Sequence, residues 1–486
     1  MDSITVIQVL ASLVLLSPLM LVVYCGVQSI FGFVGSERAT SGWTTACIVF
    51  GLLATAGTAV VLVATGGQEW TLELGSWVAL PNHSFEFHLK FIFDWLSLPF
   101  VLVTYILAGV VAAFASRYLH KEAGFQRFFL LYALFVTGLV VSALAGTIEV
   151  LFFGWELVGL ASALLVGFFH ERIGPVSNGL RVWSVYRLAD AAFLTAALAL
   201  HHMSGSGDFD QMTGSGAWPH AVTILNSHQA FGVGLLLLIA AAGKSALIPF
   251  SGWLPRAMEG PTPSSAIFYG ALSVHLGAYL LLRISPLIAA SPGLGMGVVS
   301  LGLATALYAN IVARVQADIK SALAFASLTQ VGLIVAEIGM GWWYLALVHM
   351  IGHAMMRTLQ LLRAPNLLHD YFKLETALGQ RIVRRDIAPW LSRFPTIRNR
   401  LYRFALERGH FDSLLNDYLV EPVLALFRWC ALWESRWIAM GERARPKSGQ
   451  PGNEPHHFSN AMNNTRLDPD ADSVKSDSQE RIWHDS

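Results

Sequence analysis

The sequence is poor in charged residues and in cysteine. Only 13% of its 486 residues are charged, and its 32 basic residues balance its 32 acidic ones. Soluble domains have about 25% charged residues, and a chain without net charge has no global field to attract nucleic acid. The three cysteines, Cys25, Cys47 and Cys430, form no CxxC or Cys/His pattern. This spacing argues against a disulfide framework and against a metal site.

Hydrophobic residues are abundant instead, at 54% of the chain, and the mean hydropathy is +0.53. Because a membrane-spanning helix needs about 20 mostly apolar residues, we predict an all-α polytopic membrane protein with a bundle of about 11 to 12 spans. The predicted spans are 4–34, 45–65, 93–116, 128–145, 150–169, 182–201, 230–254 (broken), 264–282, 296–313, 319–338 and 342–362.

Basic residues in the predicted loops indicate the orientation. One side carries only Lys90 and Arg283, whereas the other carries ten basic residues: Arg38, Arg117, Lys121, Arg127, Arg172, Arg181, Arg256, Arg314, Lys320 and Arg363. Basic loops favour the cytoplasmic side. We therefore expect the N-terminus outside and the C-terminus in the cytoplasm. The outer connections 67–90 and 204–228 are polar and short, so no separate exterior domain is expected.

The span around Lys244 is predicted to be broken. This lysine ends the apolar run LLLLIAAAGK, and Pro249, Gly252 and Pro255 follow within the next turns. An ammonium at membrane depth is costly, and a proline leaves backbone carbonyls that protein or water must satisfy. A broken, charged span of this kind indicates an ion site.

Other ionisable residues also fall inside predicted spans, where they are rare. They are Glu156, the pair Arg187 and Asp190, His275, Lys320 beside Asp318, and His349, His353 and Arg357, which recur every four residues on one helix face. Purely structural roles are alternatives for some of them. Arg187 and Asp190 are expected to form a structural pair, Lys320 can snorkel to the interface, and His275 can bond a neighbouring span.

For Glu156, Lys244 and the stripe of His349, His353 and Arg357 we favour a role in ion transfer. Moving a carboxylate toward or away from a desolvated lysine makes the lysine take up or release a proton. A row of titratable groups suits a water-filled proton relay. No residue pattern indicates redox chemistry or hydrolysis, so the chain is predicted to be a transporter subunit rather than an enzyme.

Four segments carry a resemblance to a known family: GWELVGL, AAAGKSALIPFSGWLPRAMEGPTPSSA, QADIKSALAFASLTQVG and LVHMIGHAMMRTL. Over roughly 93–362 the chain resembles the proton-pumping antiporter-like subunits of respiratory complex I and the sodium/proton antiporters. The resemblance implies that Glu156 and Lys244 match that family's essential Glu/Lys pair. It also implies that Lys320, His349 and His353 match its central hydrophilic axis.

The chain departs from this family in two respects. Arg357 stands where the family has a lysine, and an arginine does not release its proton. After 362 the chain turns to RAPNLLHDYFKLETALG and a basic tail, so the second inverted repeat is expected to be truncated.

Two further segments, GALSVHLGAYLLLR and RTLQLLRAPNLLHDY, resemble the DabB-type membrane subunit of bacterial inorganic-carbon pumps. This resemblance implies a large cytoplasmic, zinc-containing DabA-type partner that carries the CO2 hydration chemistry. It implies no cofactor in this chain itself and a location in the bacterial inner membrane. The alternatives left open are a subunit of a complex I-like or hydrogenase-type redox complex and a cation/proton antiporter subunit.

The resulting domain prediction has four parts. They are N-terminal spans with an outer loop (1–92), an antiporter-like proton-translocating core (93–363), cytoplasmic or interfacial amphipathic helices (364–445) and a disordered tail (446–486). Within the third part, 417–441 is apolar and Trp-rich but carries five charges. A helix lying on the membrane surface is therefore favoured over a crossing helix there.

Overall fold

The computed structural model describes residues 3–32, 35–80, 85–214, 216–378 and 394–443. Residues up to Ala425 form one compact unit, and the chain from Leu426 onward belongs to a second. The described chain is mostly helical, which confirms the predicted fold class. The predicted disordered tail lies outside the described residues.

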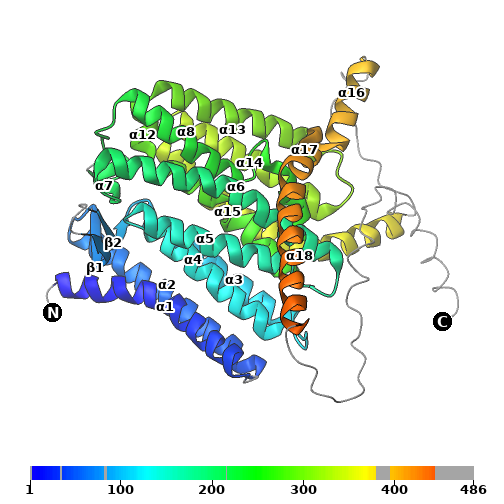
Figure 1. Ribbon diagram of the computed structural model, residues 1–486, viewed down its shortest axis with the longest axis horizontal. Coiled ribbons are helices and arrows are strands. Elements are labelled where there is room, and N and C mark those ends of the chain that lie inside the picture. Colours follow the sequence, from blue (N-terminus) through cyan, green and yellow to red (C-terminus); the bar gives the residue numbers. More distant parts are fainter. Residues whose placement is uncertain (1–2, 33–34, 81–84, 215, 379–393, 444–486) are drawn as a thin grey trace. The chain divides into compact units, whose positions relative to one another are not determined.

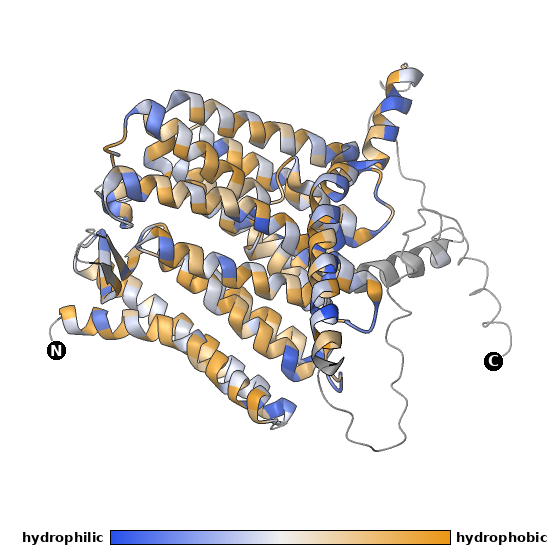
Figure 2. Ribbon diagram, in the orientation of Figure 1, coloured by the Kyte–Doolittle hydropathy of each residue, from blue (hydrophilic) through white to orange (hydrophobic). Residues whose placement is uncertain are grey.

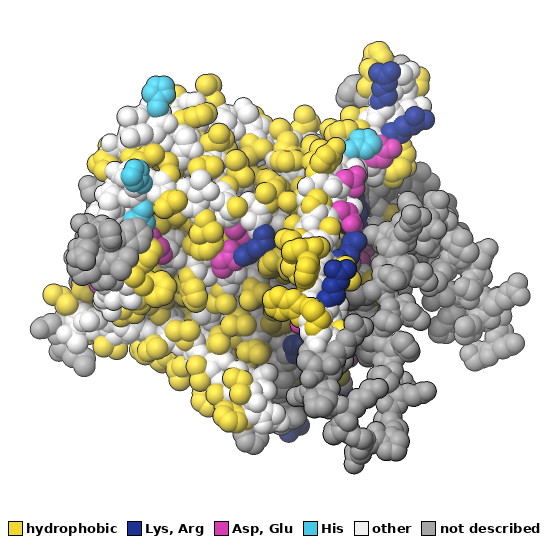
Figure 3. All heavy atoms as spheres, in the orientation of Figure 1, with side chains coloured by type: hydrophobic (Ala, Val, Ile, Leu, Met, Phe, Trp, Pro, Cys, Tyr) yellow, Lys and Arg dark blue, Asp and Glu magenta, His cyan; other side chains and the backbone are white. Residues whose placement is uncertain are grey.

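Nine described helical segments are long and apolar enough to cross a membrane. They comprise α1 (Ser3–Phe31), α2 (Glu37–Ala64), α3 (Ser97–Tyr118), α4 (Phe125–Leu144), α5 (Ile148–Val166), α6 (Ile173–Ser204), the segment Thr262–Arg283, α13 (Pro292–Ala313) and α14 (Ile319–Gly339). Figure 1 shows α3, α4, α5, α6, α8 and α13 running alongside one another in a bundle. Hydrophobic residues line α1 and α2 in Figure 2 and dominate the surface in Figure 3. An apolar exterior of this kind belongs in lipid, and the chain is a multi-pass membrane protein.

Two further predicted spans correspond to α8 (Ser227–Lys244) and α15 (Trp343–Leu378). Neither is among the nine apolar candidates. The reason is chemical, since these helices carry Lys244 and the stripe of His349, His353 and Arg357. Every predicted span therefore overlaps a described helix.

The predicted break near Lys244 is confirmed. α8 ends at Lys244, and Ala246 adopts a left-handed conformation with φ 56°. Prolines, which cannot donate a backbone hydrogen bond, keep the following turns short. These turns are η2 (Phe250–Gly252), α9 (Trp253–Arg256), η3 (Ala257–Glu259) and α10 (Thr262–Ser265), after which a π-helix, η4 (Ala266–Leu272), leads into α11 (His275–Arg283) and α12 (Ser285–Ala290).

The connection between α2 and α3 differs from the predicted loop. It forms an antiparallel hairpin of β1 (Glu69–Leu80) and β2 (Phe85–Asp94), with Glu69 opposite Asp94. The alternation in FEFHLKFIFD is the strand signal that the loop prediction overlooked. Figure 1 shows this hairpin at the same end of the bundle as the short helix α7 (Phe209–Met212).

The first unit ends in a short segment that packs against the broken helix. α16 (Pro395–Leu406) leads through Arg408 to α17 (Phe411–Leu415), and Asp412 accepts two hydrogen bonds of 3.0 Å from Arg256 Nε. The π-helix η7 (Asn416–Val420) then leads into α18 (Glu421–Arg443), which is not among the candidate spans.

Candidate functional site

Lys244 is the most deeply buried cation of the bundle that has no contacting carboxylate among the described residues. Its exposed fraction is 1%, and Nζ donates a 2.7 Å hydrogen bond to the Trp155 carbonyl of α5. Nζ also lies 4.9 Å from the Trp155 ring and 4.6 Å from the Tyr186 ring. Aromatic faces attract cations, especially where water is excluded. Gly159 leaves the room for this arrangement, because a Cβ there would lie 3.1 Å from Nζ.

Two carboxylates lie in the next layer of side chains around Lys244. Asp190 accepts hydrogen bonds from the Trp155 indole at 2.6 Å and from Arg187 at 3.0 Å. Arg187 also pairs with Glu156 and so bridges the two acids. Glu156 therefore contacts Arg187 rather than Lys244. Two cations balance two anions in this cluster, and the charges of Asp190 and Glu156 act on Lys244 without touching it.

A second polar cluster contains His275 and His353, which come from α11 and α15. His275 Nε2 lies 2.9 Å from His353 Nδ1, and His275 Nδ1 faces the Ala271 carbonyl. Because a carbonyl only accepts, His275 Nδ1 carries hydrogen, so in the neutral pair His353 Nδ1 donates to His275 Nε2. His353 Nε2 then remains as the acceptor, 3.5 Å from the Ser327 hydroxyl.

His349 lies one turn before His353 and has partners that the sequence analysis did not single out. Its Nδ1 is 2.9 Å from Glu337 Oε1 and its Nε2 is 3.1 Å from Gln330 Oε1. Gln330 and Glu337 are seven residues apart on α14 and therefore share a helix face. That spacing is the signal that could have identified them.

Arg357 and Lys320 occupy different environments. Arg357 is 5% exposed, and its Nε has no hydrogen-bond partner among the described residues. Lys320 lies in the first turn of α14, half-buried, behind the N-cap residue Asp318. No ion pair of Lys320 occurs within the described ranges. The structure thus brings Glu156, Asp190 and Lys244 into one cluster and the three histidines into another, and it leaves Lys320 outside both.

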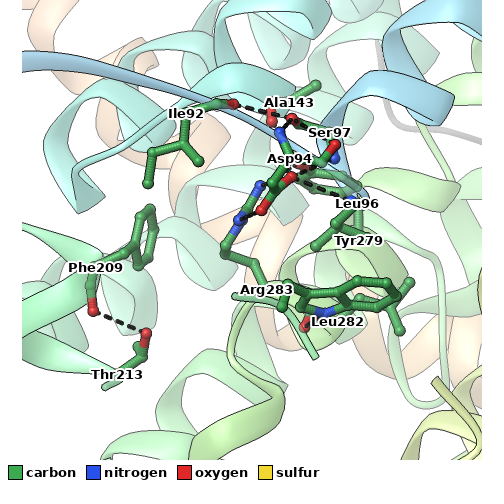
Figure 4. A network of polar contacts seen from close by, with 11 residues as sticks. Ile92, Asp94, Leu96, Ser97, Ala143, Phe209, Thr213, Tyr279, Leu282 and Arg283 are labelled. Carbon is green, nitrogen blue, oxygen red and sulfur yellow. Dashed lines mark hydrogen bonds and ion pairs between the residues drawn. The ribbon is translucent and has the colours of Figure 1, made fainter. Parts of the chain in front are cut away.

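A third set of charges lies at the hairpin end of the bundle (Figure 4). Arg283 donates to Asp94 at 2.5 and 3.3 Å and to the Tyr279 hydroxyl at 3.0 Å. Burial alone would raise the pKa of Asp94, but the Arg283 charge and hydrogen bonds from Arg283 and Ser97 hold that pKa below its usual value. The orientation analysis counted Arg283 only as a loop charge. The structure instead assigns it a buried, fully engaged ion pair.

Next to this pair lies a cavity of about 30 Å³, room for about one water molecule. Lys90, on β2 with Asp94, donates to Asp210 at 2.7 Å and lies 3.6 Å from Asp208. Burial would lower the pKa of Lys90, but the hydrogen bond and the charges of these acids raise it. These contacts attach the hairpin to α7 and to the segment before it.

No group of three or more His, Cys, Asp or Glu side chains that could hold a metal ion occurs in the part of the chain that the structure describes.

Comparison with known proteins identifies the core. Residues 145–380 match the model of the NADH:quinone oxidoreductase/Mrp antiporter membrane region, and residues 77–129 match that of the N-terminus of complex I chain 5. The core of this chain is therefore similar to the antiporter-like subunits of complex I and of Mrp antiporters. Both polar clusters lie within the matched core.

Individual relatives agree with this assignment. NADH-quinone oxidoreductase subunit L of Escherichia coli is 32% identical over 322 residues, 65% of this chain and 51% of that protein. NADH-ubiquinone oxidoreductase chain 5 of Cryptococcus neoformans is 30% identical over 409 residues, 74% of this chain and 60% of that protein. This chain thus spans about half the length of the curated relatives it matches.

Solved structures show the same fold. The Mrp complex of Dietzia matches with a TM-score of 0.58 at 24% identity, covering 80% of this chain and 40% of that one. The archaeal membrane-bound sulfane sulfur reductase matches with a TM-score of 0.61 at 19% identity, covering 73% and 70%. Both are membrane complexes of several subunits, so the antiporter-like fold occurs in heteromeric assemblies.

Proposed function

We propose that this chain is the ion-translocating membrane subunit of an inorganic carbon (CO2/bicarbonate) uptake complex. In this proposal, protons or sodium ions flow inward through the Lys244 site and drive bicarbonate formation on a cytoplasmic, zinc-containing DabA-type partner. The protein lies in the inner membrane of a bacterium, with its N-terminus outside and its C-terminus in the cytoplasm. The chain itself is not an enzyme and carries no cofactor.

The observation that carries the translocation part of this proposal is the environment of Lys244. The lysine lies at a helix break, is almost fully buried and is held by a carbonyl and two aromatic rings. Asp190 and Glu156 act on its charge from a distance. A lysine whose charge depends on distant carboxylates can exchange its proton when they move. Similarity to the antiporter-like subunits supports the same role.

The inorganic carbon part rests on the resemblance of GALSVHLGAYLLLR and RTLQLLRAPNLLHDY to DabB-type subunits. The first of these segments contains His275, which pairs with His353. The segment that carries the resemblance therefore contributes directly to the second polar cluster. Arg357, which cannot release a proton, belongs to the same stripe as His353 and would gate the relay electrostatically.

The named relatives favour a second candidate, a subunit of a redox-driven pump. Several are chains of NADH-ubiquinone oxidoreductase, and the Mrp neighbour adds a cation antiporter as a further alternative. Affinity purification from the native membrane separates these functions. Co-purification of a large zinc protein would support inorganic carbon uptake. Quinone- or cluster-bearing subunits would instead support a redox-driven pump, and small antiporter subunits would support a cation antiporter.

The mechanism is tested by uptake of labelled inorganic carbon in cells that express this chain with its partner. Lys244→Ala is expected to reduce uptake to the background seen with an uncoupler. Arg314→Gln is a suitable control, because Arg314 is exposed at the end of α13. Uncoupler-resistant, undiminished uptake in Lys244→Ala would refute the proposed coupling.

A further inference from the structure

A buried acid–base pair lies near the hairpin end of the bundle, on two helices that also carry the acids around Lys244. His201 Nε2, in the last turn of α6, lies 2.7 Å from Glu149 Oε1, in the first turn of α5. His201 is buried, and Glu149 is half-buried. Neither residue belongs to the four segments that carry the family resemblance. The resemblance thus assigns this Glu149–His201 pair no role.

The Glu149–His201 pair is enclosed by the hairpin and by the loop after α6. Gly207 of that loop packs so closely that a Cβ there would clash with both carboxylate oxygens of Glu149. The Phe87 ring of β2 lies 5.8 Å from the His201 ring. Glu149 Oε2 is buried and has no hydrogen-bond partner among the described residues. Since an ionised carboxylate only accepts, this oxygen is available to a proton or to a water molecule that donates to it.

The pair shares its helix faces with the two acids around Lys244. Glu149 precedes Glu156 by seven residues on α5, and His201 follows Asp190 by eleven residues on α6. Both spacings return to the same helix face, and they correspond to rises of about 10 Å and about 16 Å. α5 and α6 pack against each other. The pair and the two acids therefore lie along one helix interface at different depths.

Aromatic side chains occupy this interface between the two depths. The Phe152 and Phe193 rings lie 5.2 Å apart, and the Phe193 ring lies 5.4 Å from the Trp155 ring. The Trp155 indole in turn donates to Asp190. Phe193 and Trp155 are fully buried. An apolar constriction of this kind holds back water and ions until it opens.

We propose that Glu149 and His201 form an outer proton-acceptor site, which supplies Glu156 and Asp190 through the aromatic layer of Phe152 and Phe193. The inference rests on the proposed function and adds the group that receives protons from outside. In the proposed orientation the hairpin end faces outside, so the pair is the first titratable site that a proton meets on this helix interface.

Each transfer moves one proton. A proton from the outer solution enters the Glu149–His201 pair and leaves an imidazolium beside a carboxylate, whose attraction stabilises it. When the aromatic layer opens, a chain of water carries this proton to Glu156 or Asp190, since one hydrogen bond spans only about 3 Å. The pair returns to its starting state, and the carboxylate that receives the proton becomes neutral.

Other charged or titratable residues lie on the elements packed around the pair. They are His88 and Lys90 on β2, His202 on α6, Asp208 and Asp210 at α7, and His228 on α8. Lys90 donates to Asp210 and lies 3.6 Å from Asp208, so its charge is engaged by these two acids. His202 and His228 are exposed.

An isosteric variant separates proton acceptance from packing. Glu149→Gln keeps the size of the side chain and an oxygen that accepts a hydrogen bond from His201, but it has no carboxylate to take up a proton. A purely structural pair therefore predicts wild-type flux for Glu149→Gln. His202→Gln is the control, because His202 is the exposed neighbour of His201 on the same helix.

The measurement is proton flux into vesicles that contain the complete complex, with the pH on the outer face varied and thermal stability determined on the same preparation. We expect Glu149→Gln to lose about 100-fold of the flux, the lower end of what a positioned proton-transfer group contributes. Its flux should also no longer rise as the outer pH falls. His202→Gln should keep both properties. Wild-type flux, or a wild-type dependence on outer pH, in Glu149→Gln would overturn the outer acceptor site.

A second variant decides the question if Glu149→Gln does not accumulate in the membrane. His201→Ala leaves a space of the shape of an imidazole ring, so free imidazole on the outer side should restore part of the lost flux. Full flux of His201→Ala without imidazole, or no gain with it, would overturn the outer acceptor site.

Lys244→Ala separates this inference from the proposed function. If Lys244→Ala abolishes the flux and Glu149→Gln keeps it, only the outer acceptor site fails. If Lys244→Ala keeps the wild-type flux, the proposed function fails.

Discussion

Two cations, Arg283 and Lys244, are buried in this bundle with exposed fractions of 7% and 1%, yet they are held in opposite ways. Arg283 has a carboxylate in direct contact through both terminal nitrogens and a hydroxyl besides. Lys244 has a carbonyl and two aromatic faces, and its carboxylates are one layer away.

The difference separates a structural charge from a movable one. A guanidinium with a contacting carboxylate stays ionised and fixed, since removing either partner leaves an unpaired buried charge. An ammonium held by neutral groups depends on charges it does not touch, so small movements change its protonation. Burial alone does not distinguish the two cases; the first layer of partners does.

The largest effect is expected when Lys244 is replaced by arginine, the residue type of the other buried cation. Lys244→Arg keeps the positive charge but cannot release its proton. Uptake of labelled inorganic carbon should fall to background, while the protein still accumulates in the membrane. Retained uptake would mean that proton exchange at this position is not required.

Breaking the Arg283 pair should act on stability. Arg283→Met leaves Asp94 buried and unpaired, which we expect to lower the free energy of unfolding by about 3–5 kcal/mol. Chemical denaturation in detergent measures this loss. The double variant Asp94→Leu/Arg283→Met should recover most of it. If the double variant is as unstable as the single one, the pair is not the source of the effect.

A smaller effect is expected from Glu156→Gln. Arg187 keeps its hydrogen bond to Asp190, and Glu156 is partly exposed, so the stability change should stay under about 1 kcal/mol. The flux should nevertheless fall, because one of the two charges acting on Lys244 is removed. Thermal stability and flux are measured on the same preparation. A loss of stability without a loss of flux would make Glu156 a structural residue.

The smallest effect concerns Glu69, opposite Asp94 in the hairpin. Burial raises the pKa of Glu69, and the charges of Asp210 and Asp94 raise it further. The ionised form is therefore disfavoured by folding, a penalty that is absent below the unfolded pKa and complete above the folded one. Glu69→Gln should raise the melting temperature slightly at pH 7 and leave it unchanged at pH 4. An equal shift at both values would contradict this cause.

Much of the fold was predictable because the signals are local. The apolar runs predicted every span, and the prolines after Lys244 predicted the break at that residue. The hairpin was missed, although Phe85–Asp94 alternates as a strand does. A two-stranded hairpin between spans has too few residues to stand out against the runs on either side of it.

The candidate site was predictable only as a set of residues. Spacing placed His349 and His353 on one face of a helix, and it placed Arg187 near Asp190. It could not indicate that Arg187 reaches Glu156, or that His353 meets His275. Those contacts join different helices, whose relative rotation and depth depend on packing over the whole bundle.

The sequence by itself thus determined that charges lie within apolar helices and that one helix breaks at Lys244, because helix length, proline and spacing act over a few residues. Only the tertiary structure decided which charges are neutralised. In it, Asp94 pairs with Arg283, and Arg187 pairs with both Glu156 and Asp190. Lys244 contacts a backbone carbonyl and two aromatic rings instead. The physical reason is that the protonation of a buried amine depends on its neighbours in space, and these come from helices far apart in the chain.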